Sequence, residues 1–226
     1  MAVVLRDRRC ALIASAFFAY SFHYFSLAFV LPMLLITTLG NSLGNAALLG
    51  AAGMGVSAVG NVLSGPLLRY GMPPWVAIGL TFVAYIASMV GIFGGGFSTA
   101  VVALLAALAL GVGGLAPGAI YSSAPKVSPT TEMLPITVGF FQQASNLGQF
   151  GGPLVVGLMI ERMGWNHVPI ATVPLGVLGL GIALAIRHQL SGGAHSAPDG
   201  QTERSNLMAP SSPLASAAGL PSDKTP

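Results

Sequence analysis

Apolar residues run along this chain in six long stretches, separated by short breaks of glycine and polar residues. No lysine, arginine, aspartate or glutamate occurs in 11–68 or in 70–125. A helix needs roughly 20 apolar residues to cross the hydrocarbon core of a bilayer, so each charge-free stretch holds two spans. The pattern predicts six transmembrane helices, over residues 11–38, 45–68, 75–95, 99–122, 134–160 and 167–187.

Composition supports a membrane protein, because 54% of the 226 residues are hydrophobic and only 7% are charged. A water-facing surface cannot be built from so few charges. The fold class predicted is therefore an all-α integral membrane protein, with a short segment at 1–10 and a transmembrane domain at 11–187. Residues 188–226 replace bulky aliphatics with serine, glycine, alanine and proline, which is typical of a disordered tail.

The few charges predict the orientation of the chain. If successive spans cross the membrane in alternating directions, Arg162 is the only lysine or arginine of residues 1–190 on one side of the membrane. The other side receives Arg6, Arg8, Arg9, Arg69, Lys126 and Arg187. Because basic residues favour the cytoplasmic side, both termini and the tail are expected to be cytoplasmic, in a cell or inner membrane. The net charge of +3 therefore reports topology and predicts no nucleic-acid partner.

Small residues recur inside the predicted spans at four-residue spacings. In lipid, such spacings let helix backbones approach closely, where there is no hydrophobic drive for association. The pairs are Gly91/Gly95, Gly114/Gly118 and Gly148/Gly152. We expect these glycines to serve helix packing first.

One short motif occurs twice. Arg69 and Gly71 close the second segment, and Arg162 and Gly164 close the fifth, preceded in the second copy by Glu161. Segments two and five are equivalent members of two three-helix units. An odd number of spans in each unit inverts the second unit relative to the first, so the motif predicts two inverted three-helix repeats.

With Gly152-Pro153 before the second copy and Trp165 after it, these residues resemble the major facilitator superfamily. In that family a loop in each half reads Gly-x-x-x-Asp-Arg-x-Gly. The second copy fits with Gly157 in the first position, whereas Ser64 and Leu68 replace the glycine and the acidic residue of the first. The resemblance implies a solute carrier in which a gate or loop is stabilised by Arg69, Gly71, Glu161, Arg162 and Gly164. From the residues alone, snorkelling anchors at the membrane edge are an equal alternative for Arg69, Glu161 and Arg162.

Members of that family normally have twelve spans, so six spans with both ends inside resemble the C-terminal half. The resemblance then implies a second six-helix half as partner, and two arrangements stay open. The chain is a truncated or split half of a carrier, or two copies pair as a homodimer.

Two groups of polar side chains within the spans are candidate solute-binding residues. Tyr20, His23 and Tyr24 lie within about one turn of the first helix, and this face is expected to look into a watery cavity. The alternative for His23 is a hydrogen bond to a neighbouring helix that serves packing alone. No charged side chain occupies the interior of a span, so His23 is the only titratable group other than cysteine or tyrosine at mid-span.

The second group is a stripe of amides on the fifth helix. Gln142, Asn146 and Gln149 follow the spacing i, i+4 and i+7, with Gln143 beside them. This run is also similar to the eleventh helix of many family members. Such a stripe could line a solute cavity or form hydrogen bonds between helices, and both readings stay open. Asn61 and Tyr121 are weaker candidates for the same cavity.

The sequence favours a carrier of a small solute that works by alternating access in the lipid bilayer. The alternative is an inactive six-helix remnant or a membrane interaction protein. An enzyme is not expected, because the spans hold no paired carboxylates, no Ser/His/Asp set and no phosphate-binding loop. No metal site and no cofactor are predicted.

Overall fold

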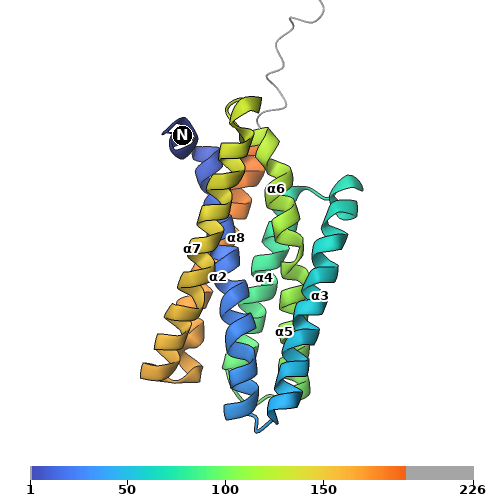
Figure 1. Ribbon diagram of the computed structural model, residues 1–226, viewed down its shortest axis with the longest axis vertical. Helices are drawn as coiled ribbons and strands as arrows, with labels where there is room; N and C mark the ends of the chain where they lie inside the picture. The colour runs from blue at the N-terminus through green and yellow to red at the C-terminus, as the bar shows by residue number, and fades with distance from the viewer. Residues whose placement is uncertain (1, 192–226) are drawn as a thin grey trace, which may run out of the picture. The chain divides into compact units, whose positions relative to one another are not determined.

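The computed structural model describes residues 2–191, which form a bundle of long helices (Figure 1). The predicted tail at 188–226 lies, from residue 192 on, outside the described residues. The helices are α1 (Ala2–Arg6), α2 (Arg8–Thr37), α3 (Leu43–Arg69), α4 (Pro74–Phe93), α5 (Thr99–Gly113), α6 (Leu115–Val127), α7 (Leu134–Met163) and α8 (Val168–Ser191), with short 3₁₀ turns η1 (Thr131–Met133) and η2 (Trp165–His167).

Each predicted span corresponds to one long helical segment, with α5 and α6 joined at Gly114 into a single span. Within residues 2–191, five segments are long and apolar enough to cross a membrane, and α7 is the remaining one. Although α7 has 30 residues, Gln142, Gln143 and Asn146 make it more polar than the others. The all-α membrane fold is therefore confirmed, and α7 stands out as its most polar long helix.

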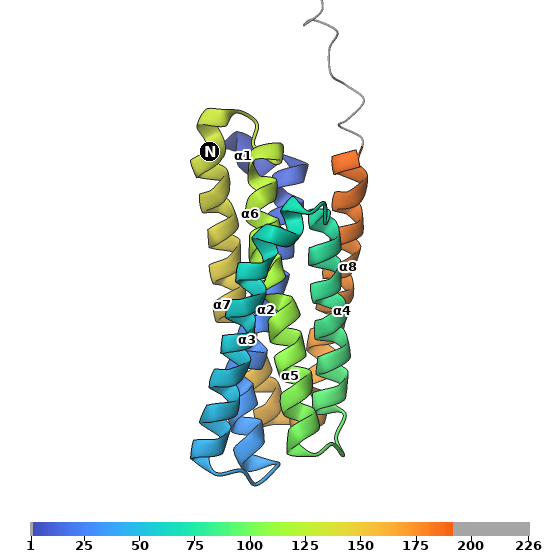
Figure 2. The same ribbon diagram turned by 90° about the vertical axis from the view of Figure 1, so that its right-hand side faces the viewer.

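Successive long helices alternate in direction, which can be followed in two views (Figures 1 and 2). As a result, the last residues of α3 lie at the same end of the bundle as the start of α2, and the last residues of α7 lie at the opposite end (Figure 1). Each of these helices is followed by a motif glycine with positive φ, 101° at Gly71 and 86° at Gly164. L side chains rarely adopt this backbone conformation, so glycine suits both positions. Gly71 lies one residue beyond the C-cap Tyr70 of α3, whereas Gly164 is itself the C-cap of α7.

Helix α2 lies at the centre and contacts all the other long helices, α3 to α8. Its contact with α7 is close because glycines face its backbone: a Cβ on Gly148 or Gly152 would collide with the carbonyl oxygens of Phe18 or Phe22. The expected packing role of this glycine pair is confirmed. The same holds for Gly114 and Gly118, which face α3.

The third glycine pair behaves differently. Gly91 packs in α4 against Leu105, where a Cβ would approach the leucine Cδ1 to 2.8 Å. Gly95 instead lies in the turn after α4, with φ of 85°. A four-residue spacing thus marks a packing surface only where the helix continues through both residues.

The start of α2 is fixed at the edge of the bundle. The carboxylate of Asp7 accepts hydrogen bonds from the backbone N–H groups of Arg9 (2.7 Å) and Cys10 (3.1 Å), and so caps the helix. The buried thiol of Cys10 donates to the carbonyl oxygen of Val127 at 3.3 Å, which ties this end of α2 to the end of α6.

Candidate functional site

The tyrosines of the first predicted group form a chain of aromatic rings along α2. The ring centroid of Tyr20 lies 6.0 Å from Phe17 and 5.8 Å from Tyr24. Tyr20 is buried with 6% of its surface exposed, whereas Tyr24 is half-buried. On its inner side Tyr20 also meets Tyr85 of α4 at 6.2 Å. The two tyrosines therefore lie between the core of the bundle and its outside.

His23 lies deeper than its neighbours and is fully buried. Its Nδ1 is 2.7 Å from the carbonyl oxygen of Ala19, and its Nε2 is 2.8 Å from that of Thr172 in α8. The ring also stacks on Tyr85 at 5.4 Å. These contacts join α2 to α8 and α4, as in the packing alternative for this residue. Only an imidazole that carries both protons could donate to both oxygens at once.

The amides of α7 make hydrogen bonds along their own helix and to α6. Tyr121 of α6 donates its hydroxyl to Oε1 of Gln142 at 2.6 Å. Gln142 in turn donates from Nε2 to Oδ1 of Asn146 at 3.0 Å. Tyr121 and Asn146 are exposed and Gln142 is half-buried, so this short chain borders the outside of the bundle. Gln143, one position further on, is exposed as well.

Gln149 belongs to a different set of hydrogen bonds. Its Nε2 donates to the hydroxyl oxygen of Ser145 at 3.1 Å, and that hydroxyl is 2.7 Å from the hydroxyl of Ser21 in α2. Both serines are buried, with 3% and 1% exposed. The predicted stripe is thus divided: its first two members bond towards α6, and the third secures the contact between α7 and α2.

Tyr121 connects the two predicted groups. Its ring meets Phe17 edge-on at 5.4 Å, and Phe17 is the ring next to Tyr20. Its hydroxyl bonds to Gln142, so phenols of α2 and amides of α7 meet through α6. We call Phe17, Tyr20, Tyr121, Gln142 and Asn146 the polar–aromatic face. Phe17 and Tyr20 are buried, with 4% and 6% exposed, so the accessible part of this face consists of Tyr121, Gln142 and Asn146.

Sequence reasoning underrated Tyr121 and missed Phe17, Ser21 and Ser145. For Ser145 a signal was available, since it lies within the amide run and four residues before Gln149. Phe17 is an ordinary apolar residue, and its place between two phenols depends on how α2 and α6 cross. Within the part of the chain that the structure describes, no three His, Cys, Asp or Glu side chains gather to hold a metal ion.

The motif side chains come from the ends of α3 and α7, which lie at opposite ends of the bundle (Figure 1). Arg69 is the last residue of α3, while Glu161 and Arg162 belong to the last turn of α7. All three side chains are exposed. Their surroundings suit contacts with headgroups, water or another protein unit, and their gate role stays a prediction.

Comparisons with known proteins agree with this fold. The sequence matches the family model described as Major Facilitator Superfamily over residues 12–218. Solved structures similar to the chain include the peptide transporter POT in complex with sulfate (TM-score 0.74, 17% identity) and a mutant of it in complex with alafosfalin (TM-score 0.73, 18% identity). No curated protein matches.

The likeness to these structures is one of fold, since the identity is low. For the transporter in complex with sulfate, the matched region covers 89% of this chain and 43% of the transporter. For the mutant in complex with alafosfalin, it covers 88% of this chain and 43% of the mutant. The chain therefore spans less than half the length of the solved transporters that it matches.

Proposed function

We propose that this chain, which belongs to the major facilitator superfamily, forms one six-helix half of a carrier that moves a small solute by alternating access. The family and the transporter fold support transport in general, across a membrane in which the chain is an integral multi-pass protein. In carriers of this kind the solute binds near the midplane, between two halves that rock against each other.

The observation that carries the proposal is the polar–aromatic face. Asn146, a member of this face, and the neighbouring Gln143 expose amide groups on a helix long enough to span the membrane, and amides in contact with lipid chains are costly. A watery cavity or a second protein unit over this face would remove that cost. The solute would then be held by the phenol of Tyr121 and the amides of Gln142 and Asn146, which suits a small polar or amphipathic molecule.

The class of solute follows from the same groups. Amides and phenols both donate and accept hydrogen bonds, so they can hold peptide-like or other neutral polar groups without a fixed charge. The similar solved structures are peptide transporters, and short peptides are therefore the first solutes to test. His23 is buried and does not reach this face. Its effect on transport would be indirect, through its contact with α8.

Uptake measurements test the proposed site. We expect Gln142→Ala and Tyr121→Phe each to reduce uptake of a transported dipeptide by about three- to tenfold. Tyr121→Phe removes the hydroxyl that bonds to Gln142, and Gln142→Ala removes the bonds to both Tyr121 and Asn146. The chain is expressed in cells together with any second half. Asn166→Ala, an exposed amide in η2, is the matched control and should leave uptake unchanged. Normal uptake in both site variants at equal membrane abundance would overturn the proposed site.

The second unit can be tested separately. A single cysteine at position 147, where Leu147 is 66% exposed on α7, reports whether another protein surface covers this helix. Cys10 is buried and suits this purpose poorly. We expect Leu147→Cys to crosslink to a second six-helix unit in membranes, and Leu178→Cys on α8, 58% exposed, to remain uncrosslinked. A strictly monomeric particle in both cases would favour an inactive remnant over a working carrier.

A further inference from the structure

Helices α3 and α7 carry exposed apolar side chains on the same side of the bundle. The two helices lie at opposite edges in one view (Figure 1), and both lie on the side away from α4 and α8 in the other (Figure 2). Each of them contacts α2 and α6. The polar–aromatic face, to which α2, α6 and α7 contribute, is therefore flanked by two helices that one partner can contact from the same direction.

The exposed side chains of the two helices differ in size. On α7, Phe150 and Leu158 lie about two turns apart and are 74% and 43% exposed. On α3, Ala51 and Ala58 have a similar spacing and are exposed as well. Helices in lipid pack closely where small side chains on one helix receive larger ones from another. The exposed side of α7 is thus complementary to the exposed side of α3.

Contacts with α6 relate the depth of α3 in the bundle to that of α7. A Cβ on Gly118 of α6 would collide with Ser64 of α3, and Tyr121 bonds to Gln142 of α7 three residues further along α6. Because a helix rises about 1.5 Å per residue, Ser64 lies about 5 Å deeper than Gln142, counted from the end where α7 begins. Ser64 is therefore at about the depth of Ser145.

This level fixes the depth of the other residues, because α3 and α7 run in opposite directions (Figure 1). On the same count, Ala51 of α3 lies at the depth of Leu158 of α7. Ala58 lies within about 2 Å of the depth of Phe150. Each large exposed side chain of α7 thus has a small counterpart on α3 at the same depth.

Exposed amides follow the same register. Asn61 of α3 and Asn146 of α7 are both exposed, and their depths differ by about 3 Å. Amides in contact with lipid chains are costly, whereas amides on two packed helices can bond to each other. A partner that presents α7 to α3 would pair large with small apolar residues and amide with amide.

We propose that this partner is a second copy of the chain, and that α3 of each copy packs against α7 of the other. The inference rests on the proposed function, for which it names the second half. All copies enter the membrane in one orientation, so a twofold axis along the membrane normal relates the two, and each contact occurs twice. The polar–aromatic faces of both copies would then line one space. Two copies also approach the length of the solved transporters, of which this chain covers 43%.

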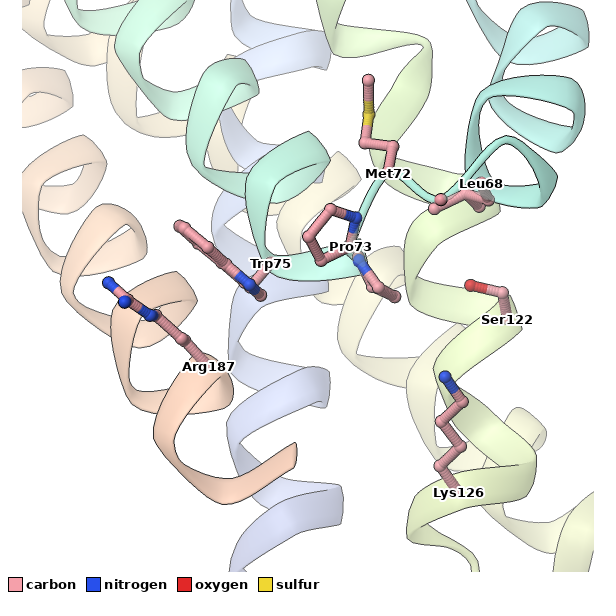
Figure 3. Close-up of a pocket in the computed structure, with 9 residues that line it drawn as sticks. Leu68, Met72, Pro73, Trp75, Ser122, Lys126 and Arg187 are labelled. Atoms are coloured by element: carbon pink, nitrogen blue, oxygen red, sulfur yellow. The ribbon is translucent and has the colours of Figure 1, made fainter. Parts of the chain in front are cut away.

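The surfaces that meet in this dimer are uncharged. Between their ends, at 43–68 and 134–160, α3 and α7 contain no charged residue. Lys126 and Arg187 line a separate cavity of about 450 Å³ between the turn after α3, α6 and α8 (Figure 3). No charge must therefore be buried when α3 and α7 of two copies pack together.

Disulfide crosslinking in membranes between two differently tagged copies tests the pairing. Both copies carry Cys10→Ala, and one also carries Ala58→Cys while the other carries Phe150→Cys. We expect this mixed pair to crosslink at least about tenfold faster than a pair of Ala58→Cys and Leu178→Cys. Leu178 is 58% exposed, but its helix α8 lies on the other side of the bundle (Figure 2).

Three results would overturn the proposal. The first is a mixed pair that does not crosslink faster than the control pair. The second is equally fast crosslinking between two copies that both carry Ala58→Cys, because the twofold axis keeps the two α3 helices apart. The third is a crosslink from Phe150→Cys to a protein of different mass in cells with normal dipeptide uptake. That result would exclude the second copy and leave the proposed function intact.

An exchange of side-chain sizes separates loss of the contact from loss of the fold. Ala58→Leu fills the space that the partner's Phe150 would occupy, so we expect co-purification of two tagged copies to fall by about fivefold or more. Phe150→Ala in the same chain makes room again and should restore co-purification. A chain that Ala58→Leu had unfolded would not recover in this way. Unchanged co-purification with Ala58→Leu, or no recovery in the double variant, would contradict the assigned register.

Discussion

Helices α2 and α3 have the same mean hydropathy of 1.6 in their most apolar windows, yet 61% of that window is buried in α2 and 22% in α3. The difference lies in the size of the buried side chains. α2 buries large residues on several faces, among them Phe17, Tyr20 and Phe22, whereas α3 buries only small ones. Hydropathy thus finds a span, and the pattern of side-chain size decides where it packs.

The buried residues of α3 form a single stripe. They are Ala46, Gly53, Ser57, Gly60 and Ser64. This stripe meets α5 and α6, while the other face of α3 exposes Val59 and Val62 by 58% and 75%. A helix with one buried stripe is peripheral in its unit and leaves a broad surface for lipid or another protein unit.

The largest effect is expected when a residue at the close contact between α2 and α7 is enlarged. Gly152→Leu would drive a side chain into the carbonyl oxygen of Phe22, and we expect the free energy of unfolding to fall by about 3 kcal/mol. The measurement is denaturation of the purified protein in mixed detergent micelles. Gly157→Leu, in the same helix with open space around its Cβ position, should have little effect. Equal losses in both variants would show that the α2–α7 contact is not close.

Removing a central side chain of α2 should have the next largest effect. His23→Ala would delete a fully buried ring and its contacts with α8 and α4, and we expect a loss of about 2 kcal/mol in the free energy of unfolding. Phe29→Ala in the same helix, with 67% of the residue exposed, serves as control and should cost less than about 0.5 kcal/mol. Equal losses in the free energy of unfolding for the two variants would show that the burial of a side chain in α2 does not decide how much it stabilises the protein.

The smallest effect is expected on the outer face of α3. Gly55 is exposed and has open space around its Cβ position, so Gly55→Ala should stabilise the protein by about 0.5 kcal/mol through higher helix propensity. Gly60, on the buried stripe, faces the carbonyl oxygen of Gly111, and Gly60→Ala should destabilise the protein. Thermal unfolding in detergent measures the change in stability of each variant. Changes of the same sign in both variants would contradict the assignment of the buried and exposed faces of α3.

Much of the fold could be predicted from the sequence, because lipid imposes strict rules on a spanning segment. Charge-free runs located the spans, and the repeated Arg-x-Gly located two turns that lie at opposite ends of the bundle. The amide run of α7 could be predicted as well. The sequence did not predict that this run divides into two sets of hydrogen bonds, because Gln142 bonds to Tyr121 of α6 and Gln149 is linked through Ser145 to α2. Both helices are distant from α7 in the chain.

The candidate site was harder to predict than the fold. Tyr20, His23 and Tyr24 share about one turn of α2, but their depths differ. His23 faces α8 and Tyr20 reaches Tyr121 through Phe17. Helix α2 is surrounded by other helices. The burial of each of its residues therefore depends on which neighbouring helix the residue faces.

The sequence alone predicts a helical membrane protein of six long segments, because backbone groups in lipid must bond within each helix. Its repeated Arg-x-Gly predicts an inverted repeat. The tertiary structure shows in addition that α2 is central, that α3 is peripheral, and that phenols and amides from three helices meet at one face. It also brought Lys126 and Arg187 to the walls of one cavity at the end of the bundle. Local rules fix each helix, whereas contacts between helices depend on close packing between residues distant in the chain.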